Sequence, residues 1–291
     1  LYIQGTVTLN DNESLDNEAD DDFEGAAIKV KSESSTLLIQ GSGTLNVNGN
    51  CKNGIKGGST AVITVAGATI NISAANNGLA SDGEVIITGG ELNITAGNDG
   101  IKSEPDEDDT DSAGCVTISG GTITIVSGGD GVQASEDLTI SGGAFDITTF
   151  GGYNASGFDS DTMSAKGLKA SGNTDDDSAT SDSTNDLTIT GGTFNLNCAD
   201  DAIHSDGYIV ITGGTFTIYS GDDGVHADTS LTLGAQNAAN CAVQLTVKSC
   251  YEGLEAGNVY IYSGSYDVTS SDDGINAAGG NGGSDAGFNP G

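Results

Sequence analysis

The sequence predicts an all-β protein that folds as a right-handed parallel β-helix of about nine turns, each of roughly 22 residues with inserted loops. A β-rich core recurs along the chain, and an Asp-Gly or Asn-Gly element, degenerate in three units, precedes each copy. The shortest steps between successive motif glycines are 22 and 21 residues, from Gly78 to Gly100 and from Gly253 to Gly274. Apolar residues alternate with Thr, Asn, Asp and Ser, which is typical of strands with one buried face. Such a unit cannot bury its apolar face alone, so the copies must stack. Right-handed coiling is the usual sense of parallel crossovers.

The repeated core reads Ile-Thr-Gly-Gly-x-(Phe/Ile/Leu)-x-Ile in its clearest copies, for example from Ile87 to Ile94 and from Ile211 to Ile218. The Gly-Gly pair predicts a tight bend with positive φ. The residues after it predict two inward columns of stacked side chains. The first column is Ile70, Leu92, Ile123, Phe145, Phe194, Phe216 and Tyr266, and the second is Ile72, Ile94, Ile125, Ile147, Leu196, Ile218 and Val268.

The repeat also indicates the domain organisation. Leucine-rich repeats, propeller blades and calcium-binding nonapeptide repeats have other periods or signatures. We therefore predict one domain over residues 1–291, with an N-terminal cap and acidic loop at 1–24 and a Gly-rich tail at 279–291. Five cysteines without a CxxC spacing predict buried thiols rather than a disulfide framework or thiolate metal site, although a Cys241–Cys250 pair stays open.

Charge restricts the partners. The chain has 8 basic residues, all lysine, against 42 acidic residues, for a formal net charge of -34. Nucleic acid and anionic membranes are excluded as direct partners because they are bound by clustered Lys and Arg. No apolar stretch is long enough for a transmembrane segment. We expect an extracellular protein, secreted or at the cell surface; a monomer is expected, with the oligomeric state open.

Acidic residues recur at the Asp-Gly element. The residue before each motif glycine forms the column Asn53, Asn77, Asp99, Asp130, Lys166, Asp201, Asp223, Glu252 and Asp273, with further acids at Asp200, Asp222 and Asp272. Two carboxylates about 5 Å apart repel by roughly 3 kcal/mol at an effective dielectric constant of 20, so the column needs compensation. Ca²⁺ is the natural cofactor because it takes six to eight oxygen ligands. The alternative is that each Asp only caps its own turn.

A second acidic column is expected after the next strand, at Asp82, Glu104, Glu136, Asp206 and Asp228. Between the two acidic columns lies an outward column with Lys56, Lys102, Lys169, His204 and His226. The two histidines would lie on adjacent turns. They are either a zinc pair or, because no third nitrogen or sulfur ligand is evident, stacked polar residues beside a hard-cation site.

Three Asp-, Ser- and Gly-rich loops are expected to lie along the same face, at 105–114, 149–164 and 172–185. A face with Ca²⁺, Lys, Asn and Ser suits a polyhydroxylated or uronate polymer, because a metal ion can bridge to a polyanion. Tyr153, with Phe150 and Phe158 in the second loop, is a candidate for sugar stacking. The carbohydrate-binding candidates are thus Lys102, Lys169, His204, His226 and Tyr153.

The repeat, together with Asp-Asp-Gly-Val-His-Ala-Asp at 222–228, resembles the bacterial, largely clostridial, secreted proteins described as carbohydrate-binding domain-containing. The resemblance covers about Phe23 to Ala278. It implies a pectate-lyase-like β-helix that binds Ca²⁺, cellulose and polygalacturonate (pectin) without catalysis. With the column argument it gives these metal-ligand candidates: Asp99, Asp130, Asp200, Asp201, Asp206, Asp222, Asp223, Asp228, Asp272 and Asp273.

Two rival functions stay open. One is a calcium-dependent pectate lyase, in which a basic side chain removes the proton next to a carboxylate. Pectate lyases often use Arg, which this chain lacks, so the base would be Lys169 or Lys166. The other rival is a structural surface or adhesion rod without a sugar ligand.

Overall fold

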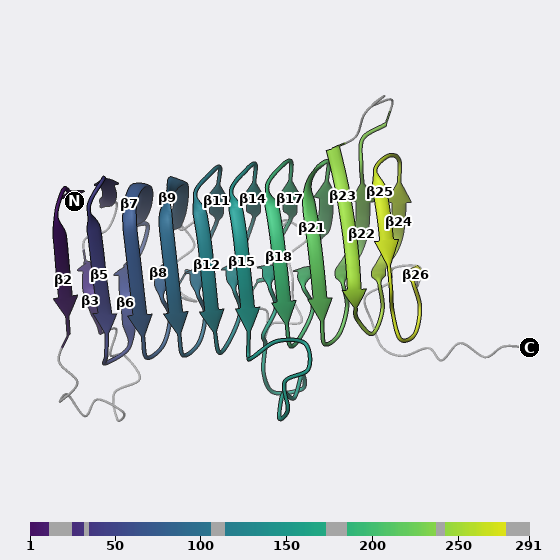
Figure 1. The fold of residues 1–291 in the computed structure, drawn as a ribbon, viewed down its shortest axis with the longest axis horizontal. Coiled ribbons are helices and arrows are strands. Elements are labelled where there is room, and N and C mark those ends of the chain that lie inside the picture. Colours follow the sequence, from purple (N-terminus) through teal and green to yellow (C-terminus); the bar gives the residue numbers. More distant parts are fainter. Residues whose placement is uncertain (12–24, 32–34, 106–113, 173–184, 237–241, 278–291) are drawn as a thin grey trace, which may run out of the picture.

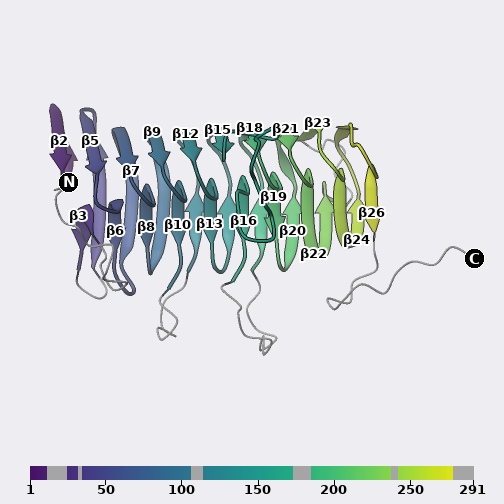
Figure 2. The ribbon, with the colours of Figure 1, turned by 90° about the horizontal axis from the view of Figure 1, so that it is seen from below.

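The computed structural model describes residues 1–11, 25–31, 35–105, 114–172, 185–236 and 242–277. In these ranges the chain forms a parallel β-helix, which confirms the predicted fold class (Figures 1 and 2). Each turn contributes strands to three faces, here called A, B and C, and every strand pairs in parallel with its counterpart one turn away. None of the described segments is a helix that could cross a membrane.

Face C lies in front in Figure 1. Its strands are β2 (Thr6–Asn10), β5 (Thr44–Gly49), the second parts of β7 (Val62–Ala74) and β9 (Glu84–Ala96), β12 (Thr122–Ser127), β15 (Ala144–Thr149), β18 (Thr193–Cys198), β21 (Gly213–Ser220), β23 (Ala242–Ser249) and β25 (Ser265–Val268).

Face A follows face C along the chain. Its strands are β3 (Ala26–Val30), β6 (Asn53–Gly57), β8 (Leu79–Ser81), β10 (Ile101–Ser103), β13 (Val132–Ala134), β16 (Leu168–Ala170), β19 (Ile203–Ser205), the first parts of β22 (Val225–Leu233) and β24 (Leu254–Ile261), and β26 (Ile275–Ala277).

Face B closes each turn. It contains β1 (Tyr2–Ile3), β4 (Thr36–Gly41), the first parts of β7 and β9, β11 (Val116–Ile118), β14 (Leu138–Ile140), β17 (Leu187–Ile189), β20 (Tyr208–Ile211) and the second parts of β22 and β24. Within the region expected as an N-terminal cap, β1 pairs with β4 and β2 pairs with β5.

The core is built from the predicted inward columns. The register pairs Phe145 with Phe194 and Phe194 with Phe216, as the repeat indicates. The rings of Phe145 and Phe194 stack with centroids 4.7 Å apart, and those of Phe194 and Phe216 with centroids 4.5 Å apart. All three are buried. The aromatic column is therefore core, not a sugar platform.

Glycines are required for different reasons at the bend between faces B and C and at the bend between faces C and A. At the bend between faces B and C, the second Gly of each pair has positive φ, for example 105° at Gly121 and 115° at Gly143, which confirms the predicted role. At the bend between faces C and A, the motif glycine is required by close approach. A Cβ on Gly100 would lie 2.5 Å from Cγ2 of Ile125 and 2.7 Å from the carbonyl oxygen of Gly131.

Of the three loops expected along one face, the structure describes only the one at 149–164. Residues 150–164 connect β15 of face C to β16 of face A. Residues 106–113 and 173–184 fall outside the described ranges, as does Cys241 of the open Cys241–Cys250 pair.

Candidate functional site

The predicted acidic column lies at the bend between faces C and A, and its side chains form a hydrogen-bonded ladder. Oδ1 of Asp130 accepts a hydrogen bond from the backbone N–H of Lys166 at 2.8 Å. Asp201 accepts from the N–H of Asp223 at 3.0 Å, and Asp223 from that of Glu252 at 3.2 Å. Each side chain thus satisfies the amide at the same position one turn later, so part of the column serves turn structure.

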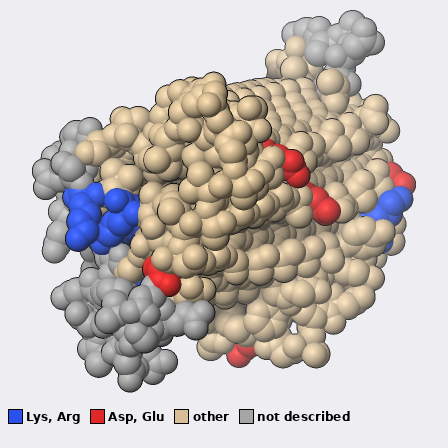
Figure 3. All heavy atoms as spheres, turned by 60° about the vertical axis from the view of Figure 1, so that its left-hand side comes forward, with Lys and Arg blue, Asp and Glu red and all other residues tan. Residues whose placement is uncertain are grey.

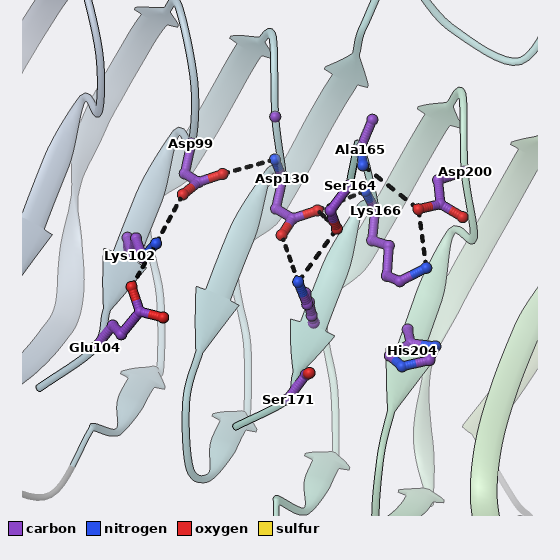
Figure 4. A network of polar contacts seen from close by, with 12 residues as sticks. Asp99, Lys102, Glu104, Asp130, Ser164, Ala165, Lys166, Ser171, Asp200 and His204 are labelled. Carbon is purple, nitrogen blue, oxygen red and sulfur yellow. Dashed lines mark hydrogen bonds and ion pairs between the residues drawn. The ribbon is translucent and has the colours of Figure 1, made fainter. Parts of the chain in front are cut away.

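The second carboxylate oxygen of these residues faces the outward basic column on face A (Figure 4). Lys102 Nζ lies 3.4 Å from Asp99 and 2.5 Å from Glu104, and Lys169 Nζ lies 3.0 Å from Asp130 Oδ2. The register confirms the column, since it pairs Lys169 with His204 and His204 with His226. Basic side chains of the protein therefore supply much of the charge compensation that the sequence assigns to metal ions.

Lys166 takes the place of an acid in the column and neutralises two others. Its Nζ lies 2.9 Å from Oδ2 of Asp200 and 2.9 Å from Oδ2 of Asp201 (Figure 4 shows the Asp200 contact). Burial alone would lower the pKa of Lys166, but the charges of Asp201 and Asp200 raise it above its usual value. Lys166 is thus held as an ammonium ion.

Both histidines lie between two carboxylates. Nδ1 of His204 is 3.0 Å from Asp201 Oδ2, and its Nε2 is 3.0 Å from Asp206 Oδ1. Nδ1 and Nε2 of His226 lie 3.3 Å from Asp223 Oδ2 and 3.4 Å from Asp228 Oδ1. Burial opposes the charged imidazole, yet these contacts raise the pKa of His204 and raise that of His226 to about 11.

The same charged neighbours shift the pKa values of the carboxyl groups. Burial would raise the pKa of Asp201, but the hydrogen bond from His204 and the charge of Lys166 hold it below the usual value of 3.8. By contrast, burial and the charges of Asp201 and Asp200 raise the pKa of Asp222. Glu255 lies 3.7 Å from His226 Nδ1, and burial together with Asp223 raises its pKa to about 7.

Four groups of side chains in the described part of the chain bring potential metal-ligand atoms within 4.8 Å of one another. They are Asp201, His204 and His226; Asp223, His226 and Glu255; Asp200, Asp201 and Asp222; and Glu252, Asp272 and Asp273. Two groups offer only oxygen atoms. Lys166 already neutralises one of these, at Asp200 and Asp201.

The structure adds two acids to the predicted ligand set and corrects one column. Glu252 and Glu255 each belong to one of the groups. The sequence does identify the position of Glu252, because Glu252-Gly253 stands where other units have Asp-Gly. Glu136 does not belong to the second acidic column. The N–H of Ser135 bonds to the carbonyl of Ser103, so Ser135 stands in register with Glu104.

Tyr153 lies apart from the other predicted sugar-binding residues. Its N–H donates to Asn197 Oδ1 at 3.0 Å, and its ring centroid is 5.3 Å from that of Tyr219 on face C. Phe150 and Phe158 pair with each other at 5.5 Å. Lys102, Lys169, His204 and His226 instead share face A, so the predicted set is divided between two faces.

A hollow of about 480 Å³ lies on the outer surface of face C, over strands β2 to β12. At its centre, Asn71 donates a hydrogen bond to Asn46 at 2.8 Å, and Asn93 donates to Asn71 at 3.0 Å. Asn46 in turn donates to Thr8 at 3.2 Å. The hollow has an uncharged lining that consists of Thr8, Asn46, Asn48, Asn71, Ile72, Ser73, Asn93, Ile94, Thr95, Thr124 and Val126.

The comparisons with known proteins give one family. The family model described as carbohydrate-binding domain-containing protein matches residues 3–224 and 182–284. The chain belongs to this family. No curated protein and no solved structure matches the chain significantly.

For a carbohydrate-binding domain, the two faces offer different chemistry. Face A is a surface of carboxylates and cations on which Lys102, Lys169 and His204 each pair with a carboxylate of the protein. Face C presents amides and hydroxyls without charge in its hollow. An Asn amide has two donors and about two acceptor positions, so the ladder leaves one of each for a ligand on a central Asn such as Asn71.

Proposed function

We propose that this protein binds plant cell-wall polysaccharide outside the cell without cleaving it, and that the hollow on face C holds a neutral glucan such as cellulose. The amide ladder of Asn46, Asn71 and Asn93 is the observation that carries the proposal. Sugar hydroxyls both donate and accept hydrogen bonds, so they complement amides that keep one free donor and one free acceptor. Family membership supports a carbohydrate ligand.

The charge of the hollow favours a neutral polymer there. The chain has a net charge of -34, yet the hollow is uncharged. Figure 3, which turns the N-terminal end of the rod forward, shows few acidic side chains among the described residues on this side. Glu91 borders the hollow, since its Oε1 lies 3.5 Å from Asn93 Nδ2. A neutral glucan meets little electrostatic cost at this surface.

Polygalacturonate requires a different contact because it is a polyanion. A bound cation can bridge its carboxylates to acidic side chains, and Ca²⁺ accepts oxygen ligands from both. Glu252, Asp272 and Asp273 fit Ca²⁺ best: they offer only oxygen atoms, and no lysine or histidine within the described ranges forms an ion pair with them. We therefore assign calcium-dependent stabilisation and pectin binding to this end of face A.

Two observations favour binding over lyase catalysis. A lysine that acts as a general base must be a neutral amine when it accepts a proton. Lys166 is held protonated by Asp200 and Asp201. Lys169 donates to the buried carboxylate of Asp130 and lies 3.2 Å from Ser164 Oγ, so its side-chain nitrogen is engaged within the protein.

Retention on insoluble cellulose tests the hollow. Asn71→Ala removes the centre of the ladder and should lower retention at least tenfold, while Asn195→Ala is the matched control. Asn195 occupies the same outward column on β18 and donates to Asp146 at 2.8 Å, but it lies outside the hollow. Equal retention of both variants would reject the hollow as the site. No retention of the wild-type protein would favour a structural rod.

A further inference from the structure

We propose that Asp201, His204 and His226 form a binding site for a first-row divalent transition metal, Zn²⁺ by the nature of the ligands. The site is separate from the calcium and glucan sites proposed above. It answers the question that the histidine pair leaves open in the sequence, because the third ligand is a carboxylate oxygen rather than a nitrogen or sulfur. Two imidazoles and one carboxylate, with water in the fourth position, are a known zinc ligand set.

The distances suit a tetrahedral ion. Oδ2 of Asp201 lies 3.0 Å from Nδ1 of His204 and 3.7 Å from Nδ1 of His226. Ligand atoms bound to zinc at about 2.0–2.1 Å in a tetrahedron lie roughly 3.3–3.4 Å apart. The two observed distances lie on either side of this value and within a few tenths of an ångström of it, and all three ligand atoms lie within 4.8 Å of one another.

A carboxylate beside each Nε2 atom fixes the orientation of both rings. Nε2 of His204 lies 3.0 Å from Asp206, and Nε2 of His226 lies 3.4 Å from Asp228. A carboxylate at one ring nitrogen holds the proton there and leaves the lone pair of the other nitrogen for a metal. Both Nδ1 atoms face Asp201, and a metal ion that displaces their protons would bind there.

The backbone holds the three ligands in place. His204 on β19 and His226 on β22 are direct partners in the face A register. Oδ1 of Asp201 is fixed by the N–H of Asp223 at 3.0 Å, which leaves Oδ2 toward the rings. The side chain of Asp201 is 3 % exposed, that of His204 12 % and that of His226 28 %, so water reaches the cluster beside His226.

The donor atoms distinguish this site from a calcium site. Imidazole nitrogen favours Zn²⁺ and related ions, whereas Ca²⁺ takes oxygen ligands. The neighbouring group of Asp223, His226 and Glu255 has only one nitrogen, and the remaining two groups have none. Lys166 shares Oδ2 of Asp201, which can accept a second partner because a carboxylate oxygen has two lone pairs.

The test uses the full chain, freed of metal with a chelator and then titrated with Zn²⁺ or Co²⁺ in the presence of millimolar Ca²⁺. We expect one tightly bound Zn²⁺ per chain and a visible absorption band of four-coordinate Co²⁺. His204→Gln and His226→Gln should each weaken binding at least tenfold, and Asp206→Asn, which leaves all three ligands, by about 10- to 100-fold. Lys102→Gln is the control because Lys102 occupies the same column between Asp99 and Glu104.

Three results would overturn the site: no Zn²⁺ bound at about 100 µM, unchanged binding in both histidine variants, or displacement of Zn²⁺ by Ca²⁺. Far-ultraviolet circular dichroism establishes that each variant is folded. Cellulose retention of the same variants should equal that of the wild-type protein, because the hollow is on face C. A failure of the zinc site is thereby distinguished from a failure of the proposed function.

Discussion

Asp99 and Asp130 stand one turn apart, and Oδ1 of Asp99 accepts a hydrogen bond from the backbone N–H of Asp130 at 2.9 Å. Asn77 makes the same bond to the N–H of Asp99 at 3.1 Å, and Asn53 to that of Asn77 at 3.2 Å. An amide and a carboxylate are thus equivalent for this bond. The carboxylate differs from the amide in its charge, which is unfavourable here: burial and the charge of Asp130 raise the pKa of Asp99.

Replacement of Asp99 separates the effect of the hydrogen bond to Asp130 from the effect of the buried charge. Asp99→Asn keeps the acceptor for the Asp130 N–H and removes a buried charge, so the free energy of unfolding should change by less than about 1 kcal/mol. Asp99→Ala leaves that N–H without its partner and should cost about 1–3 kcal/mol. Urea denaturation of both variants with a chelator measures this. Equal losses of unfolding free energy in the two variants would show that the hydrogen bond to the Asp130 N–H does not stabilise the fold. If Asp99→Asn is less stable than the wild-type protein only when Ca²⁺ is present, Asp99 is a metal ligand.

The phenylalanine column gives a second prediction. Phe194 is 1 % exposed and stacks on Phe145 and Phe216. Phe194→Ala should lower the free energy of unfolding by about 3–5 kcal/mol because it leaves a cavity in the core. Phe158→Ala, in the half-buried pair with Phe150, should cost far less. Comparable losses in thermal denaturation would contradict the assignment of this column to the core.

His226 makes stability depend on pH. Its folded pKa is raised to about 11 from 6.5, so the stabilisation is complete below pH 6.5 and is lost as the pH rises toward 11. In metal-free protein, the melting-temperature difference between wild type and His226→Gln should therefore shrink from pH 6 to pH 9.5. A difference that stays constant over this range would mean that His226 is not charged in the folded state.

Calcium should stabilise the C-terminal end of face A. A ligand at one hundred times its Kd stabilises the folded state by about 2.7 kcal/mol. Glu252→Gln should reduce the rise in melting temperature on calcium addition by at least half, because it removes a ligand from the Glu252, Asp272 and Asp273 group. Asp146→Asn on face C is the control, since Asp146 bonds to Asn195. An unchanged calcium response in Glu252→Gln would place the ion elsewhere.

The repeat predicted the backbone and the register of the core and of the basic column, because parallel pairing one turn apart leaves little freedom in which residues stack. Phe145, Phe194 and Phe216 are the clearest case. The predicted register is wrong where the segment between strand and bend differs in length from one unit to the next. Ser135, not Glu136, is aligned with Glu104.

Side-chain partners are harder to predict than register. The sequence placed Lys102 between acidic columns, but the contact of Lys166 with Asp200 and Asp201, one turn on, depends on a rotamer. The amide ladder was not predicted from the sequence, because its asparagines also fit the ordinary polar positions of an amphipathic strand. The recurrence of Asn46, Asn71 and Asn93 at one outward phase was the available signal.

The most direct test of noncatalytic binding incubates the protein with polygalacturonate and millimolar Ca²⁺ and follows two signals in one sample. Ultraviolet absorbance reports unsaturated product, and sedimentation of the polymer gel reports bound protein. We predict that the protein is retained on the polymer and that absorbance stays at the level of a protein-free control. Product that forms with the wild-type protein and vanishes with Lys169→Ala would contradict the account and make the protein a lyase.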